Sequence, residues 1–257
     1  MKNIHKKSLS SFGDEWRTFT YELKDSEIID IFNNYFDVFP KKFLNHDSIG
    51  FDLGCGTGRW AKFIAPKVKK LYCIDPSLPA LNVAKKKLNH FNNCCFLNQN
   101  SNNFSIKKET MDFGYSLGVL HHVPNTKAAV SNCVSKLKKG SPFLLYLYYN
   151  LDNRSQNYKF IWQLSNILRL IISRLPFKIK IFFTNLIAYV IYFPWIKFLK
   201  FLKYINIKIN NLPLSFYIDK SIYIIKNDSL DRFGTPLEKR FSKKQIENLM
   251  RESGLEK

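Results

Sequence analysis

A glycine-rich loop between residues 50 and 60 constrains the fold more than any other part of the sequence. The loop reads Gly50-Phe-Asp52-Leu-Gly54-Cys-Gly56-Thr-Gly58-Arg-Trp60, and it connects an apolar segment over 48–53 to a helical pattern. Glycine has no Cβ, so closely spaced glycines let the backbone turn sharply and approach a ligand. The order of strand, glycine loop and helix predicts the start of a β-α-β unit with a ligand at the loop.

Strand and helix patterns alternate after this loop. Short apolar segments over 70–74, 94–97, 112–117 and 142–149 predict four further strands. One helical pattern ends at Leu88, and another begins at Asn125 and ends at Gly140 with lysines in its last turn. This order predicts an α/β fold with a doubly wound, mostly parallel sheet.

The glycine spacing excludes two common phosphate-binding loops. A GxGxxG dinucleotide fingerprint would need its third glycine at position 59, where the chain has Arg59. A P-loop would end in Gly-Lys followed by Ser or Thr, and the loop contains no such sequence. The expected ligand is therefore not one held through a pyrophosphate.

Several motifs together resemble the class I S-adenosylmethionine-dependent methyltransferases, in particular the type 11 and ubiquinone-biosynthesis methylases. Asp52-x-Gly54-x-Gly56-x-Gly58 resembles motif I of that family, and the segment over 112–122 resembles its strand-four motif. Leu137-Lys-Lys-Gly140 resembles the element before strand five, and the stretch over 240–254 resembles the helix before strand six. The likeness covers most of residues 48–150 and 231–254. It implies a Rossmann-like methyltransferase fold with S-adenosylmethionine as the cofactor.

The resemblance also implies a set of cofactor-binding residues. Asp75, at the end of the second predicted strand, matches the acid that accepts hydrogen bonds from the ribose hydroxyls. Asn100 and Ser101 stand where the family often has an Asp-Ala pair beside the adenine, and an Asn carbonyl can still accept from the amino group. The implied residues are Trp16, Asp52, Gly54, Cys55, Gly56, Gly58, Asp75, Pro76, Asn100, Ser101 and Leu117.

Two features concern the cover and the chemistry of this site. The segment around Trp16 resembles an N-terminal lid of some relatives, in which this side chain would cover the adenosyl group. A helix packed on the sheet is the alternative.

His121 and His122 follow the fourth strand, at the edge where ligands bind, so either could act as a base near neutral pH. A structural role in packing the loop is the alternative. No metal site is expected, because the five Cys residues show no ligand spacing.

The region over 151–214 has a different character. It holds ten Lys and Arg residues but only one acid, Asp152, and prolines at 176, 194 and 213 are expected to break its helices. Its most apolar stretch, 181–196, has 16 residues, whereas a spanning helix needs about 20. Lysines at 197, 200 and 203 alternate with apolar residues, a pattern typical of helices on anionic membrane surfaces. An apolar stripe packed on the core, with solvated lysines, is the alternative.

The net charge of +20 arises from 40 Lys and Arg residues against 20 acids, and only eight of the 40 are Arg. Nucleic-acid sites favour Arg for bidentate contacts, so nucleic acid is not an expected partner. The basic N-terminus lacks the apolar stretch of a signal peptide. Cys residues without a disulfide pattern indicate a reducing compartment, so we expect a cytoplasmic protein, with an anionic membrane surface bound through 177–204 as a further partner.

These features together predict four segments. They are an N-terminal helical cap over 1–47, an S-adenosylmethionine-binding core over 48–150, a helical basic and aromatic insert over 151–230, and the last helix of the core over 231–257. The family's C-terminal hairpin is expected to be missing, because the sequence has three residues after Gly254. A truncated sequence and a sheet that closes without the hairpin are the two interpretations. The expected function is methyl transfer to a small-molecule or lipid-linked acceptor. An RNA methyltransferase and a non-catalytic membrane-surface or binding protein on a degenerate scaffold are the alternatives.

Overall fold

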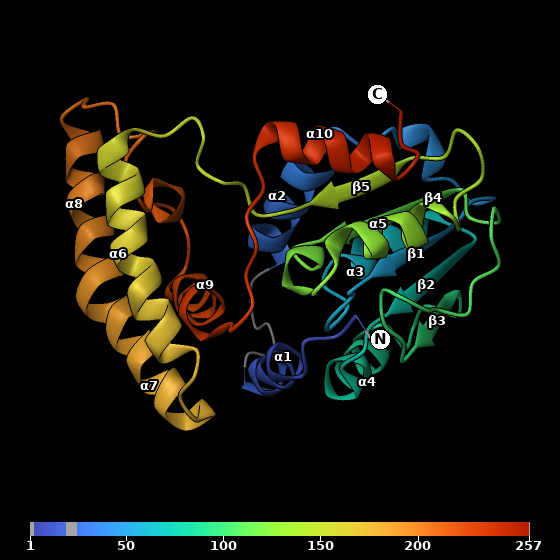
Figure 1. Ribbon diagram of the computed structural model, residues 1–257, viewed down its shortest axis with the longest axis horizontal. Helices are drawn as coiled ribbons and strands as arrows, with labels where there is room; N and C mark the ends of the chain where they lie inside the picture. The colour runs from blue at the N-terminus through green and yellow to red at the C-terminus, as the bar shows by residue number, and fades with distance from the viewer. Residues whose placement is uncertain (1–2, 19–24, 257) are drawn as a thin grey trace. The chain divides into compact units, whose positions relative to one another are not determined.

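The chain divides into two compact units in the computed structural model, which describes residues 3–18 and 25–256. The first unit, here called the sheet unit, comprises Met1–Asn150 and Leu237–Lys257. The second, the helical unit, comprises Leu151–Pro236. Figure 1 shows that the first contains the sheet and that the second is built from helices.

A five-stranded parallel sheet forms the centre of the sheet unit (Figure 1). The strands are β1 (Ile49–Leu53), β2 (Lys70–Ile74), β3 (Cys94–Leu97), β4 (Phe113–Leu117) and β5 (Phe143–Tyr146). They lie in the order β3-β2-β1-β4-β5, and all four pairings are parallel. The predicted doubly wound sheet is confirmed. Its strand order reverses between β1 and β4, and ligands of such sheets bind beyond the carboxyl ends of the strands at this point.

The helices of this unit are α1 (Lys6–Thr18), α2 (Asp25–Phe36), α3 (Ala61–Ile64), α4 (Leu78–Lys87), α5 (Thr126–Val134) and α10 (Lys243–Glu252). Side-chain caps begin α4, α5 and α10. The side chain of Asn125 accepts a hydrogen bond from the first turn of α5. Ser242 and Gln245 form a capping box at the start of α10.

Two apolar clusters cover the opposite faces of the sheet. Successive side chains of a strand point to opposite faces of the sheet. The side chains on each face of this sheet therefore pack into a separate cluster. Tyr115 of β4 belongs to the cluster formed with α2, α3 and α4, whereas Phe51 of β1 belongs to the cluster formed with α5 and α10. The sheet is therefore buried on both sides, as its apolar strands require.

A short parallel pairing follows β5. The Phe241 N–H donates to the Tyr148 carbonyl at 2.8 Å, and the Asn150 N–H donates to the Phe241 carbonyl at 2.9 Å. Within the described ranges, no antiparallel strand joins the sheet beyond β5. The segment that leads into α10 thus runs beside the end of β5.

The helical unit contains α6 (Gln156–Ile172), α7 (Phe177–Ile187), α8 (Phe193–Tyr204) and α9 (Ile222–Gly234). The prediction that Pro194 breaks the helix is wrong, because α7 continues into α8 through a π-helical turn at Ala188–Tyr192. Pro194 lies in the first turn of α8, and the π turn before it changes the backbone pairing, which accommodates the missing N–H. The result is one uninterrupted helical run over Phe177–Tyr204.

Candidate functional site

The glycine loop turns the chain at the carboxyl end of β1. Gly54, Gly56 and Gly58 have φ angles of 79°, 54° and 80°, in the left-handed region that favours glycine. A Cβ on Gly54 would lie 2.4 Å from Val119, and a Cβ on Gly58 would lie 2.8 Å from Leu88. Larger residues are excluded here by both conformation and space. The two glycines therefore let Val119 and Leu88 pack against the loop, and close approach of a ligand to its backbone stays a prediction.

Asp75 follows β2 and forms the polar centre of this edge. It is only 8% exposed, and its two carboxylate oxygens accept hydrogen bonds from Gly56 N at 2.9 Å and Ser77 N at 2.7 Å. Burial raises the pKa of Asp75 from 3.8 to about 6, while these two hydrogen bonds limit the rise. A carboxylate offers about four acceptor positions, so each oxygen retains one for a ligand hydroxyl. This arrangement fits a ribose diol.

Asp52 lies deeper, inside the sheet. It is 1% exposed, and burial raises the pKa of its carboxyl group well above 3.8, with the neighbouring Tyr115 hydroxyl acting in the opposite direction. Tyr115 is also its register partner on β4. Asp52 thus supports the strand end beneath the glycine loop, and direct contact with the cofactor stays a prediction. Cys55, the next predicted residue in the loop itself, is likewise buried at 4% exposed.

Two predicted residues follow the end of β3. The side-chain carbonyl of Asn100 accepts from the Asn102 N–H at 2.9 Å, so it closes a local turn. Ser101 is 6% exposed, and its hydroxyl has no hydrogen-bond partner among the described residues. A buried hydroxyl without a protein partner can bind a ligand atom. Pro76 directly follows Asp75, and Leu117 is the last residue of β4, so both stand at carboxyl ends of strands in the same sheet.

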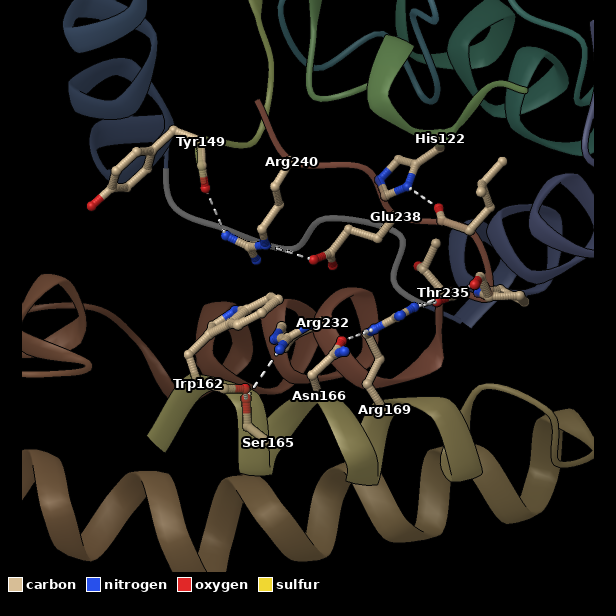
Figure 2. Close-up of polar contacts among 12 residues, drawn as sticks. His122, Tyr149, Trp162, Ser165, Asn166, Arg169, Arg232, Thr235, Glu238 and Arg240 are labelled. Carbon is tan, nitrogen blue, oxygen red and sulfur yellow. Dashed lines mark hydrogen bonds and ion pairs between the residues drawn. The ribbon is translucent and has the colours of Figure 1, made fainter. Parts of the chain in front are cut away.

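His121 and His122 occupy a short 3-10 turn after β4, Leu120–His122. The His121 ring is 0% exposed and stacks on Tyr148 with centroids 3.8 Å apart. Burial, followed by the neighbouring His122 and Arg240 charges, lowers the pKa of His121 well below 6.5. His122 Nδ1–H donates to the Leu237 carbonyl at 2.6 Å (Figure 2). Both rings are enclosed, which favours the packing role, and their catalytic role stays a prediction.

Arg240 completes this aromatic cluster, and no sequence motif indicates its role there. Its Nε donates to Glu238 Oε1 at 2.8 Å, and its Nη1 donates to the Tyr149 carbonyl at 3.2 Å (Figure 2). Its guanidinium lies 5.3 Å from the centroid of the Tyr148 ring, which in turn stacks on His121. The Glu238 side chain is only 2% exposed, so this is a largely buried ion pair. The residues come from distant parts of the sequence, and only the fold brings them together.

α1 lies beside the turn that carries Asp75. A Cβ on Gly13 of α1 would be 3.4 Å from the Ser77 hydroxyl, and the Phe12 ring is centred 5.0 Å from the His122 ring. α1 therefore packs beside the turn after β2 and the histidine turn, and its role as a lid stays a prediction. The Trp16 side chain lies outside the described residues.

Comparison with known proteins agrees with this geometry. A family model for a methyltransferase domain matches residues 51–140, which include the glycine loop, Asp75 and the histidine turn. The search of curated protein sequences gives no match.

The chain also matches solved structures at low sequence identity and with TM-scores below 0.5. A proposed methyltransferase from Bacillus halodurans is 20% identical, with a TM-score of 0.46 over 55% of this chain and 59% of that one. The YcgJ protein of Bacillus subtilis is 20% identical, with a TM-score of 0.45 over 53% of this chain and 59% of that one. A SAM-dependent methyltransferase from Thermotoga maritima is 16% identical, with a TM-score of 0.47 over 95% of this chain and 82% of that one.

The chain thus spans 59% of the length of the first two structures. The matched segment, 51–140, coincides with the part of the sheet unit that contains the glycine loop and Asp75. Over this segment the chain matches a methyltransferase domain, which is consistent with the resemblance to the class I methyltransferases and with S-adenosylmethionine as the cofactor.

Proposed function

We propose that this protein transfers the methyl group of S-adenosylmethionine to a small-molecule or lipid-linked acceptor. The observation that carries the proposal is the Asp75 carboxylate, buried at the carboxyl end of β2 and held by Gly56 N–H and Ser77 N–H. Its remaining acceptor positions match the two hydroxyls of a ribose. The partnerless hydroxyl of Ser101 offers a further polar contact on the same side of the sheet.

The cofactor supplies a methyl group bound to positively charged sulfur, and the protein supplies binding and orientation. In our proposal Asp75 holds the ribose, and the glycine loop lets the backbone lie against the cofactor. α1 excludes water from this edge, which strengthens the polar contacts inside it. No group of the protein has to form a covalent bond in such a transfer.

An acceptor that starts protonated would also need a base, and His121 and His122 are the candidates at this edge. The low pKa of His121 keeps its ring neutral at pH 7. A neutral imidazole can accept a proton, although the buried position disfavours the charged form that results. For an acceptor that is already deprotonated, the two rings would only shape the turn after β4.

The first test is calorimetric titration with S-adenosylhomocysteine. Asp75→Ala should weaken binding by about 10- to 100-fold, because charge-assisted hydrogen bonds to the ribose are lost. Asp47→Ala, which changes an exposed acid before β1, is the matched control and should bind like the unchanged protein. Because the Asp75 pKa is about 6, binding should weaken as the pH falls below 6, and Asp75→Asn should remove that dependence. Equal binding by Asp75→Ala and the unchanged protein would contradict the assignment.

The second test identifies the acceptor class. Labelled S-adenosylmethionine is incubated with the protein and a cell extract, which is then separated into lipid, small-molecule and RNA fractions. We expect label in the lipid or small-molecule fraction, and none with Asp75→Ala. Label in RNA would contradict the proposed acceptor. Tight cofactor binding with no label in any fraction would favour the non-catalytic alternative.

A further inference from the structure

The helical unit exposes large apolar side chains along two of its helices. On α6, Phe160, Ile161 and Ile171 are 60%, 53% and 58% exposed. On the helical run over Phe177–Tyr204, Phe182, Val190 and Phe201 are 62%, 63% and 57% exposed. We call these six side chains the outer apolar face. Soluble monomers rarely expose so many large apolar residues in one region, so a partner is expected to cover them.

α6 also buries a charged side chain. Arg169 of α6 is 6% exposed and donates from Nη1 to the Thr235 carbonyl at 3.0 Å and from Nε to Asn166 at 2.8 Å (Figure 2). By helical spacing, Phe160 and Ile171 lie on the side of α6 opposite Arg169. The unit therefore turns a charged group inward and aromatic or aliphatic groups outward.

α7 repeats this arrangement against α9. Lys180 is 5% exposed, and its ammonium group donates to the Gly234 carbonyl at 2.8 Å. Thr184 is 1% exposed, and its carbonyl accepts from the Ser229 hydroxyl at 2.8 Å. Phe182 falls on the opposite side of the same helix. Polar groups in the interior with apolar groups outside are what a surrounding lipid phase favours, because lipid cannot satisfy exposed polar groups.

The helical run over Phe177–Tyr204 is the one helix in the described ranges that is long and apolar enough to cross a membrane. It has 28 residues and a mean hydropathy of 1.5. An interior helix of a soluble protein can pass the same test when it is mostly buried, but only 28% of this helix's most apolar window is buried. Composition and exposure therefore agree in favouring contact with lipid.

Charge decides how such a helix would lie. Its uncharged stretch, 181–196, has 16 residues, or about 24 Å of helix, against a hydrocarbon core of about 30 Å. Lys197, Lys200 and Lys203 follow at once and are all exposed. In a spanning orientation these ammonium groups would approach the hydrocarbon. In an orientation parallel to the surface they reach the headgroups while the apolar face inserts.

From this arrangement we propose that the helical unit binds the surface of an anionic lipid bilayer, with the outer apolar face inserted between the lipids and its helices parallel to the membrane plane. Apart from the buried Arg169 and Lys180, eight Lys and Arg residues against one acid over 151–214 provide the complementary charge. The outer apolar face belongs to the helical unit and the proposed cofactor residues to the sheet unit, so the proposal does not depend on catalysis. It also gives a lipid-linked acceptor a physical route to the protein.

Vesicle co-sedimentation of the full chain tests this surface. The vesicles contain phosphatidylcholine alone or equal parts of phosphatidylcholine and phosphatidylglycerol. We expect the protein to pellet with the anionic vesicles, and at least about tenfold less with the neutral ones, since each basic residue near an anionic surface contributes about 1 kcal/mol. Failure to pellet with the anionic vesicles at low salt would overturn the proposal.

Two double variants test separately how the apolar side chains and the lysine charges contribute to vesicle binding. Phe182→Gln combined with Val190→Gln changes two exposed side chains of the outer apolar face and should reduce vesicle binding at least about tenfold. Val38→Gln, at a 78% exposed position of the sheet unit, is the matched control and should bind normally. Lys197→Gln combined with Lys200→Gln should remove most of the preference for anionic vesicles. Normal vesicle binding by both combined variants would overturn the assigned surface.

Two further measurements test the alternatives to the proposed lipid contact. In the first alternative a second copy of the chain covers the outer apolar face, and in the second the helix spans the bilayer. Light scattering without vesicles reports whether the protein forms a dimer. If it forms a dimer that the Phe182→Gln substitution dissociates, and the protein does not bind vesicles, the lipid assignment would be overturned. Quenching of Trp195 fluorescence by brominated lipids reports depth, with Trp195→Phe as the background. Bromine near the headgroup should quench more than bromine near the chain end, and the reverse would overturn the parallel orientation. S-adenosylhomocysteine titration of the same variants should be unchanged, so failure of the cofactor proposal is detected separately.

Discussion

At the scale of single residues, the buried ring of His121 is the group with the clearest consequence. It is 0% exposed, and neither ring nitrogen has a hydrogen-bond partner among the residues that the structure describes. Burial therefore disfavours its charged form and lowers its pKa well below 6.5. Between the two pKa values the unfolded chain binds a proton that the folded protein does not, so this residue makes the fold less stable as the pH falls.

His121→Phe should remove this acid sensitivity while keeping the stack on Tyr148. Below pH 6.5 the free energy of unfolding of the unchanged protein should fall relative to the variant by about 1.4 kcal/mol for each pH unit. Asp75 acts in the opposite sense, because its raised pKa makes the folded state bind more protons between pH 3.8 and about 6. That contribution is common to both proteins and cancels in their difference. Urea unfolding at several pH values measures this difference.

His90→Phe supplies the control, since it replaces an exposed histidine of the same unit. It should leave the pH dependence of unfolding unchanged. If His121→Phe also shows the same pH dependence as the unchanged protein, the ring is not held neutral by burial.

At the scale of elements, β1 and β4 fit together through two reciprocal Gly-Phe pairs. Gly50 is the register partner of Phe113, and Phe51 is the register partner of Gly114. A Cβ on Gly50 would lie 2.2 Å from the Phe113 ring, and a Cβ on Gly114 would lie 2.3 Å from the Phe51 ring. Each glycine thus makes room for a fully buried ring across the strand pair, one pair on each face of the sheet.

Gly50→Ala should destabilise the sheet unit by between about 1 and 3 kcal/mol, because the Phe113 ring has no space into which to move. The expected measurement is a lower urea midpoint at unchanged slope. Combining it with Phe113→Leu should recover part of the loss, since the smaller side chain relieves the overlap. Gly13→Ala, which places a Cβ at an ordinary 3.4 Å contact in α1, should cost nothing. A Gly50→Ala protein as stable as the unchanged one would show that the strands are not packed as described.

At the scale of the whole molecule, the chain contains two units with different interiors. The sheet unit encloses two apolar clusters, one on each face of the sheet. The helical unit encloses smaller apolar clusters around Leu199 and Phe233, together with the buried charges of Arg169 and Lys180. Because each unit has its own core, each should unfold as a separate cooperative transition.

Scanning calorimetry should therefore resolve two transitions, only one of which responds to S-adenosylhomocysteine. At a ligand concentration a hundred times its Kd, the sheet-unit transition should be stabilised by about 2.7 kcal/mol, whereas the other should not move. Asp75→Ala should abolish the shift. A single transition that S-adenosylhomocysteine shifts as a whole would mean that the two units unfold together.

The sequence predicted the order of the sheet well, because local signals define its elements. Glycines with no room for a Cβ, alternating apolar strands and capping residues such as Ser242 act within a few residues of one another. The ribose-binding role of Asp75, implied by the resemblance, stays a prediction, and the structure adds the two backbone N–H groups that hold its carboxylate. The prediction about Pro194 was wrong, because a π turn a few residues earlier removes the conflict that a proline normally creates in a helix.

The sequence by itself determined the α/β fold, the glycine loop and the basic character of the helical region, since these depend on residue type and short spacing. Only the tertiary structure decided that Arg240, Tyr148 and His121 form one cluster. It alone also decided that Arg169 and Lys180 point inward while Phe160 and Phe182 point outward. A helical pattern shows which residues share a side of a helix. Which side is buried depends on the element that packs against it, and here α9 covers the polar side.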